Sequence, residues 1–213
     1  MESRNPADSP RLECFFDCSS PWTYLGFHNL PAVAARAGVT VRWRPFLVGG
    51  VFNTINPSVY ASRERPVPAK QAYMLKNLRD WAALAGVEIR FPPTVFPVNS
   101  VRVMRACVAL QDDPAMPRLA RAAFEAYFGS DVDISTEAAF RDICEVAGLD
   151  PDEMLARADS EQARAGLREN TDELIRRGGF GSPTMFVDGG DMYFGNDALP
   201  LVEAALARAG SSK

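Results

Sequence analysis

The pattern of apolar and polar residues predicts a β-α-β unit at the start of the chain. Leu12–Phe16 is an apolar run of strand length, and Val39–Arg44 alternates apolar with polar residues, so both are predicted strands. A helix is expected between them over Pro21–Arg36, because proline favours a first helical turn and Gly38 can end the helix. Pro31 lies inside this helix and is expected to kink or shorten it. The two strands should be parallel.

The C-terminal part predicts a β-hairpin and a final helix. Residues 183–187 and 192–194 are strand-like, and Asp188, Gly189, Gly190 and Asp191 between them are typical of a turn. Apolar residues recur at helical spacing over 197–209. The chain therefore closes with β-β-α.

Residues 46–180 are predicted to be almost entirely helical. Asp150, followed by proline and acidic residues, is a helix N-cap signal, and apolar residues recur every three or four positions over 101–110 and 119–127. The stretch 47–70 is rich in Pro, Asn, Ser and Gly and predicts an irregular loop.

These elements predict an α/β fold interrupted by a large helical insertion. The expected α/β domain consists of residues 11–45 and 181–210, and the helical insertion domain of residues 46–180. Residues 1–10 are polar and are expected to be disordered.

Composition narrows the classes of partner. The chain has 213 residues and a net charge of −4, which gives no reason to expect nucleic acid or an anionic membrane as a partner. No signal peptide or membrane span is expected. The four cysteines show no C-x-x-C motif and no metal-ligand spacing, and Cys14, Cys107 and Cys144 lie in apolar segments. We expect a soluble cytoplasmic protein without a metal site.

The junction between the first strand and first helix carries the candidate chemistry. It reads Ser20-Pro21-Trp22-Thr23, whereas thiol-disulfide oxidoreductases have C-P-x-C there. Lowering a thiol pKa from ~8.5 to near 6.5 takes roughly 2.7 kcal/mol. A helix dipole contributes ~0.3–1 kcal/mol and a hydroxyl–thiolate hydrogen bond ~1.5–3 kcal/mol, so the two together suffice. Ser20 is thus either a plain helix cap or a donor to a thiolate that the protein does not itself supply.

Two C-terminal segments can likewise be interpreted either as ordinary structural features or as parts of a binding site. Ser182-Pro183 precedes the third strand and is either a cis bond facing the start of the first helix or an ordinary edge proline. Gly195 with Asn196 and Asp197 precedes the last helix and is either a plain cap or a site for the charged end of a small zwitterion.

Together these motifs resemble those of the 2-hydroxychromene-2-carboxylate isomerases and kappa-class glutathione transferases. The similar segments are Phe16-Asp17, Ser20 to Gly26, Gly181 to Phe186 and Phe194 to Asp197, and Phe96 to Ser100 is more similar to the isomerases. The resemblance covers about residues 12–207. It implies a DsbA-like, thioredoxin-like domain with a helical insertion, forming a homodimer that binds glutathione.

The resemblance also implies roles for individual residues. Ser20 matches the catalytic serine that holds the glutathione thiolate, and Ser182, before cis-Pro183, matches a backbone contact to the cysteinyl part. Asn196 and Asp197 match the pair that receives the γ-glutamyl end. Looser matches to glutathione-contacting loop residues are Lys70 and either Asn53 or Asn56. Two departures are Ser182, where relatives usually have an apolar residue, and Cys18, which lies two residues before Ser20.

The isomerase function would be cis-trans isomerisation of an aromatic α,β-unsaturated keto acid in aromatic-compound catabolism, by reversible thiolate addition. The substrate carboxylate would meet a cation or amide from the set Arg63, Arg65, Lys70 and Asn99. The substrate ring would stack on aromatic residues from the set Trp22, Phe52, Tyr60, Tyr73 and Trp81. Each of these aromatics is also an ordinary packing residue.

Three other functions remain open at this point. A kappa-like transferase or peroxidase would share every glutathione contact but consume the thiolate. A DsbA-like redox protein would use Cys18, although Thr23 stands where a resolving cysteine is needed. A protein that binds glutathione without chemistry would show binding and no turnover.

Overall fold

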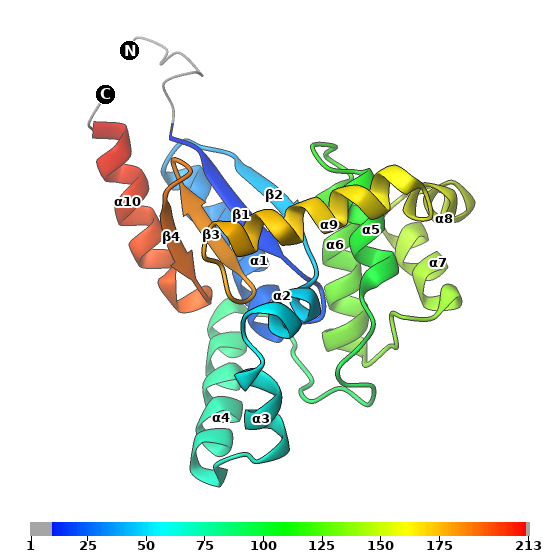
Figure 1. The fold of residues 1–213 in the computed structure, drawn as a ribbon, viewed down its shortest axis with the longest axis horizontal. Helices are drawn as coiled ribbons and strands as arrows, with labels where there is room; N and C mark the ends of the chain where they lie inside the picture. The colour runs from blue at the N-terminus through cyan, green and yellow to red at the C-terminus, as the bar shows by residue number, and fades with distance from the viewer. Residues whose placement is uncertain (1–9, 212–213) are drawn as a thin grey trace.

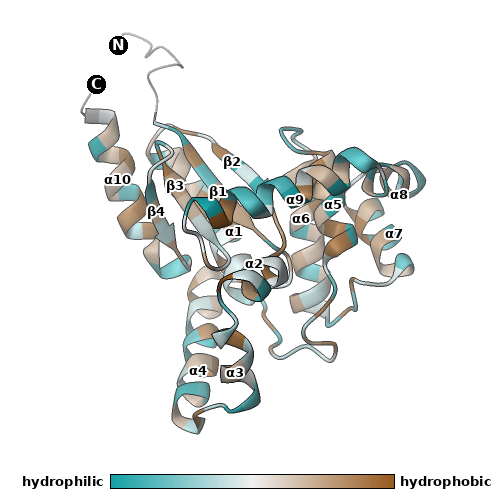
Figure 2. Ribbon diagram, in the orientation of Figure 1, coloured by the Kyte–Doolittle hydropathy of each residue, from teal (hydrophilic) through white to brown (hydrophobic). Residues whose placement is uncertain are grey.

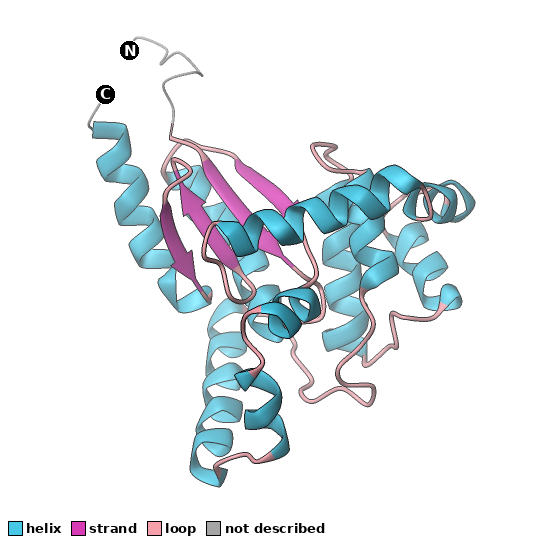
Figure 3. Cartoon of the chain, in the orientation of Figure 1, coloured by secondary structure: helices cyan, strands magenta, loops and turns pink. Residues whose placement is uncertain are grey.

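A four-stranded mixed sheet organises the N- and C-terminal parts of the chain. The computed structural model describes residues 10–211, without the side chains of 62, 63 and 211. Strands β1 (Leu12–Phe16) and β2 (Val41–Pro45) are parallel, and β3 (Thr184–Val187) and β4 (Asp191–Phe194) form the antiparallel hairpin. The strand order is β2-β1-β3-β4, with β1 antiparallel to β3 (Figures 1 and 3). The predicted β-α-β and β-β-α units are confirmed.

Alternating side chains of β1 supply both faces of the sheet. Leu12 and Cys14 pack with α1 (Pro21–Arg36) and α10 (Leu199–Ser211) on one face. Phe15 packs on the opposite face with Phe46, Val51, Leu174 and Phe186. Phe46 lies two residues before α2 (Val48–Thr54), and Val51 lies in it. Leu174 lies in α9 (Glu161–Arg176), which crosses this face in Figure 1. The insertion therefore covers one side of the sheet.

Residues 46–180, all of them described, contain helices and no strand. The remaining helices there are α3 (Ser58–Glu64), α4 (Pro68–Ala85), α5 (Val101–Ala109), α6 (Met116–Phe124), a π-helical turn over Glu125–Gly129, α7 (Glu137–Val146) and α8 (Pro151–Ala158). Helix α9 is largely hydrophilic (Figure 2) and buries only one stripe, Ala163, Leu167, Asn170, Thr171 and Leu174.

The helical part and the sheet part share a hydrophobic core. Tyr24 in α1 stacks on Phe124 in α6, with ring centroids 5.1 Å apart and planes 7° apart. Phe27 in α1 contacts the same Phe124 ring at 5.4 Å. Helix α1 thus packs against the sheet on one side and against α6 on the other. Whether 46–180 is a separate domain stays a prediction.

The structure corrects two local predictions. Stretch 47–70 is not an irregular loop, because it folds into α2, α3 and the start of α4. Buried Val51 and a hydrogen bond of 2.8 Å from the Val48 N–H to Asp17 hold α2 in place, and composition does not reveal such tertiary contacts. Helix α1 also continues past Pro31 to Arg36, so the expectation that this proline shortens the helix is wrong; buried Leu30 and Val33 anchor both sides of that position.

Of the expected disordered segment 1–10, residues 1–9 lie outside the described residues, and Pro10 is buried.

Candidate active site

Ser20 is the N-cap of α1, directly after the turn that follows β1. Its backbone is extended (φ −112°, ψ 125°), and its Oγ accepts a 3.2 Å hydrogen bond from the Thr23 N–H. The half-buried hydroxyl therefore lies at the positive end of a 16-residue helix. An anion placed here would meet a hydroxyl and a favourable dipole.

The segment before β3 lies against this helix start. The Ser182–Pro183 bond is cis, as the resemblance implies, and the Ser20 hydroxyl is 3.5 Å from the Ser182 carbonyl oxygen, to which it donates. The Thr23 hydroxyl donates to the Ser182 Oγ at 2.7 Å. Ser20, Thr23 and Ser182 thus form a closed triangle of hydrogen bonds. Sequence reasoning did not assign a role to Thr23 or to the Ser182 hydroxyl.

Gly26 allows α1 to approach the cis-proline. A Cβ atom at this position would lie 2.9 Å from the Pro183 Cγ, closer than carbon atoms pack. Gly26 belongs to the N-terminal motif, but only the structure gives the reason for a glycine there.

Asp17 is a buried carboxylate next to the site, and sequence reasoning did not assign it a role. Its Oδ1 accepts hydrogen bonds from the Ser19 N–H at 2.9 Å and the Ser100 hydroxyl at 2.7 Å, and its Oδ2 accepts from the Val48 N–H at 2.8 Å. Its own N–H donates to the Ser182 Oγ at 3.1 Å. Burial raises the pKa of Asp17, and the hydrogen bonds oppose that rise. Asp17 joins the starts of α1, α2 and α5.

Cys18 has the environment of a structural thiol. It is fully buried, its Sγ faces the Ala120 carbonyl at 3.9 Å, and its N–H points to the Met104 sulfur at 3.4 Å. Burial, reinforced by neighbouring Cys107, raises the pKa of Cys18 well above the ordinary thiol value. A thiol that stays protonated is a poor nucleophile, which counts against the redox function.

The segment before α10 is tied to the cis-proline. The Gly195 N–H donates to the Pro183 carbonyl at 3.0 Å, with Gly195 in a positive-φ conformation (φ 90°). Asn196 is 1% exposed; its Oδ1 accepts from Asn29 in α1 at 2.9 Å, and its Nδ2 has no hydrogen-bond partner among the described residues. Asp197 is exposed. The Asn196 side chain therefore points inward, and the Asp197 side chain is accessible to solvent.

The three expected loop residues differ in their relation to this site. Asn56 donates to the Phe180 carbonyl at 3.2 Å, two residues before Ser182, so it lies at the edge of the site. Asn53 accepts instead from the Tyr60 hydroxyl at 2.8 Å, and Lys70 is exposed near the start of α4. The structure brings only Asn56 to the site.

The four expected substrate-binding residues divide into two pairs. Trp22 and Trp81 are half-buried and pack on one hydrophobic cluster around Leu25 and Leu78, where α4 meets the first turns of α1. Tyr73 is 65% exposed on α4. Asn99 is exposed and accepts from the Val101 N–H at 3.1 Å. Trp22 and Trp81 are the pair that packs where α4 meets α1, the helix that Ser20 caps.

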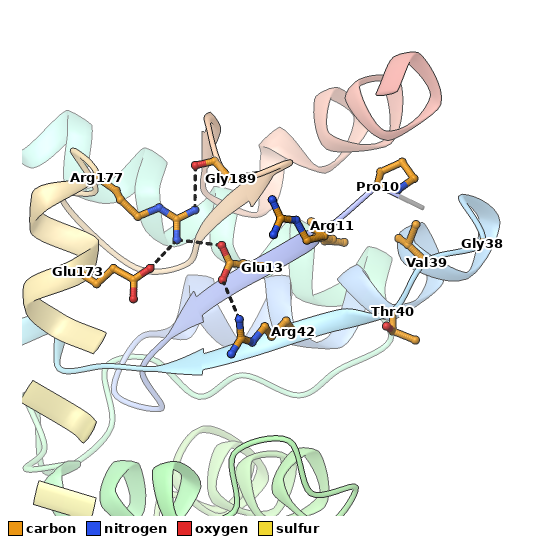
Figure 4. A pocket seen from close by; sticks show the side chains of 11 residues that line it. Pro10, Arg11, Glu13, Gly38, Val39, Thr40, Arg42, Glu173, Arg177 and Gly189 are labelled. Atoms are coloured by element: carbon orange, nitrogen blue, oxygen red, sulfur yellow. Dashed lines mark hydrogen bonds and ion pairs between the residues drawn. The ribbon is translucent and has the colours of Figure 1, made fainter. Parts of the chain in front are cut away.

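A cavity of about 570 Å³ lies at the opposite end of β1 from Ser20 (Figure 4). In it, Glu13 bonds to Arg177 at 2.9 Å, and Arg177 bonds to Glu173 at 3.0 Å. None of the expected site residues lines it. Among the described residues there is no cluster of three potential metal ligands and no helix able to cross a membrane.

Comparisons with known proteins agree with this fold. A family model for the DSBA-like thioredoxin domain matches residues 11–207, so the chain belongs to this family. The glutathione S-transferase kappa 2 of Caenorhabditis elegans is 31% identical over 209 residues, 92% of this chain and 91% of that protein. A 2-hydroxychromene-2-carboxylate isomerase of Sphingobium xenophagum is 29% identical, covering 92% of this chain and 97% of that protein.

A solved structure of a 2-hydroxychromene-2-carboxylate isomerase has a TM-score of 0.75 and 26% identity, covering 92% of this chain and 94% of that chain. The resemblance inferred from the motifs is thereby confirmed, as is the thioredoxin-like fold with a helical insertion. The chain belongs with enzymes of two named kinds, isomerases and glutathione transferases.

Proposed function

We propose that this protein is a glutathione-dependent isomerase of the 2-hydroxychromene-2-carboxylate type. The observation that carries the proposal is the Ser20 hydroxyl at the start of α1 and beside cis-Pro183, while the adjacent Cys18 is buried and protonated. A site of this form suits a thiolate brought by another molecule. Glutathione, when bound, would supply a thiolate that adds reversibly to the substrate alkene and permits rotation.

The residues present fit that role. Within residues 10–211 the Ser20 hydroxyl donates only through a long 3.5 Å bond to the Ser182 carbonyl, so redirecting it to a thiolate gives up little. The Thr23 N–H keeps its bond to Ser20 Oγ and fixes the oxygen. Exposed Asp197 is suited to the ammonium of the γ-glutamyl end, and Asn196 to a backbone contact, since its side chain is turned inward.

The remaining assignments are part of the same proposal. Asn56 at the site edge supports a contact to glutathione, and Lys70 and Asn53 are the weaker candidates because neither has a contact to the site. Trp22 and Trp81 are the proposed ring-binding residues, with Tyr73 and Asn99 further out. We also propose a cytoplasmic homodimer active in aromatic-compound catabolism, since glutathione is abundant in the cytoplasm and all four cysteines are buried free thiols.

A kappa-like transferase is the second candidate, supported by 31% identity to a kappa-class relative. It would use the same Ser20 site and consume glutathione. Segment 96–100 resembles the corresponding segment of the isomerases and therefore favours the isomerase function. Ser100 at its end donates to the buried Asp17 carboxylate beside the site.

The test is turnover of 2-hydroxychromene-2-carboxylate by wild type and Ser20→Ala, followed by the substrate spectrum and by free-thiol titration. We expect turnover only with glutathione, an unchanged thiol concentration, and a loss in Ser20→Ala of about 10- to 100-fold. Ser160→Ala is the matched control, because Ser160 caps another 16-residue helix with a 3.1 Å bond to the Ala163 N–H. Consumption of thiol would instead identify a transferase, and equal rates in wild type and Ser20→Ala would refute the role of Ser20.

A further inference from the structure

The bond between the hydroxyls of Thr23 and Ser182 forms the one side of the hydrogen-bond triangle that does not include Ser20. The other two sides join the Ser20 Oγ to the Thr23 N–H at 3.2 Å and to the Ser182 carbonyl at 3.5 Å. Both partners of Ser20 are therefore linked to each other through a 2.7 Å bond. The position of the Ser20 hydroxyl relative to β3 depends on this link.

Both members of the pair are held inside the protein. Thr23 is 0% exposed and Ser182 is 7% exposed, so water does not compete for their bond. The Asp17 N–H donates to the same Ser182 Oγ at 3.1 Å, and the Asp17 carboxylate is fixed by Ser100 and Val48. The Ser182 hydroxyl thus connects the start of β3 to the turn after β1 and to α1.

We propose that the Thr23–Ser182 hydroxyl pair is a positioning unit that keeps the Ser20 hydroxyl and the Ser182 backbone in the arrangement that binds a thiolate. This proposal rests on the proposed use of glutathione. When Ser20 turns its hydrogen from the Ser182 carbonyl to a thiolate, one side of the triangle opens. The Thr23–Ser182 bond remains and keeps α1 and β3 at a fixed separation, so the site is organised before the ligand arrives.

The proposal gives Ser182 a purpose that its backbone alone does not explain. An apolar residue before cis-Pro183 would still present its N–H and C=O groups to a ligand. It would leave the Thr23 hydroxyl and the Asp17 N–H without the acceptor they share here. Loss of either hydroxyl therefore breaks the Thr23–Ser182 bond, and loss of the Ser182 hydroxyl also leaves the Asp17 N–H without its acceptor.

The experiment compares the binding of glutathione and of S-methylglutathione, which has no thiol to ionise. The variants are Thr23→Val and Ser182→Ala, singly and together, and Thr23→Ser as the conservative variant. Thr171→Val is the matched control, because its buried hydroxyl accepts from the Leu47 N–H at 3.1 Å and donates to the Leu167 carbonyl outside the triangle. Thermal unfolding confirms that each protein is folded.

Thr23→Val and Ser182→Ala are each expected to weaken glutathione binding about tenfold, through loss of part of a charge-assisted hydrogen bond. S-methylglutathione binding should change less than about twofold by the same reasoning, since a thioether carries no charge. The double variant should bind glutathione no more weakly than Ser182→Ala alone, because Thr23→Val removes only a bond that Ser182→Ala also removes. The pH midpoint for glutathione binding should rise in these variants and stay at the wild-type value in Thr23→Ser.

Two results would overturn the inference. In the first, Thr23→Val and Ser182→Ala both keep the wild-type ratio between the affinities for glutathione and for S-methylglutathione. This result would refute the positioning role and leave the proposed function intact. An absence of glutathione binding by the wild-type protein would refute the proposed function and this role with it. Should one single variant fail to fold, the other tests the same bond from the opposite side.

Discussion

The Ser100 hydroxyl donates a 2.7 Å hydrogen bond to the buried Asp17 carboxylate, although 83 residues separate the two. Asp17 follows β1 and Ser100 is the N-cap residue of α5, so the bond joins the sheet to the insertion beside the site. Each carboxylate oxygen of Asp17 accepts from a backbone N–H, that of Ser19 on Oδ1 and that of Val48 on Oδ2, and a backbone N–H cannot accept a hydrogen bond in return.

We expect Asp17→Asn to destabilise the protein by about 1–3 kcal/mol, because either orientation of the amide turns an N–H₂ group toward a donor in a buried place. The free energy of unfolding in urea measures the effect. Asp131→Asn is the control, since exposed Asp131 accepts from the N–H and hydroxyl of Thr94 and should lose much less. An equal loss in the two variants would show that burial of Asp17 is not the cause.

Gly26→Ala should destabilise by about 1–3 kcal/mol through overpacking, because the added Cβ meets the Pro183 ring. The same variant should bind glutathione more weakly, since the cis-proline must move. Gly49→Ala is the control: a Cβ there meets nothing within 4 Å, and alanine in a helix gains up to about 1 kcal/mol. Both are measured by thermal unfolding, and a neutral Gly26→Ala would contradict the close approach of α1 to Pro183.

Glu173 should make stability depend on pH in the acid range. Burial opposes ionisation of Glu173, but hydrogen bonds and charges of Arg44 and Arg177 outweigh it and hold the pKa of its carboxyl below the usual value. Because the folded pKa is the lower one, this stabilisation is present above the usual glutamate pKa of about 4.3 and is lost as the pH falls through the folded value.

The wild-type protein should therefore exceed Glu173→Gln in unfolding free energy at pH 7, and the gap should narrow below about pH 4. Urea titrations at a series of pH values measure it. Glu153→Gln, which removes an exposed ion pair with Arg157 on one helix, should have a smaller effect at pH 7. A gap that does not change with pH would contradict the assignment to Glu173.

None of the four cysteines should react with an aromatic disulfide reagent in the native protein. All are buried, and burial raises the pKa of Cys144 to about 11 and holds that of Cys18 well above the ordinary thiol value. In denaturant all four should react within the dead time of the same assay. A single fast-reacting thiol in the native protein, lost in Cys18→Ala, would restore the redox function to consideration.

Much of the sheet and of the site could be predicted from the sequence because the signals are local. Leu12–Phe16 is a short apolar run, Ser20 has a proline in the next position, and Ser182-Pro183 precedes a strand. Each of these rests on backbone preferences of a few adjacent residues, and the structure confirms β1, the cap of α1 and the cis bond.

The parts that escaped prediction depend on residues distant in the chain. Helix α2 forms in a segment of loop-like composition because Val48 and Leu47 bond to Asp17 and Thr171. The inward turn of Asn196 depends on Asn29, 167 positions earlier. A pattern read over a few residues contains no information on such partners.

The stacking of Tyr24 on Phe124 has a consequence for how this protein can be divided. Helix α1 carries the candidate nucleophile-binding serine at its start and, one turn later, an aromatic surface that belongs to the core of the insertion. Removing residues 46–180 would take away packing partners of Tyr24 and Phe27 in α1 and of Phe16 in β1, and would leave this surface open to water. The sheet and its flanking helices would then lack part of their hydrophobic core. A shortened protein that keeps the Ser20 site must therefore retain α6, although α6 lies far from Ser20 in the sequence.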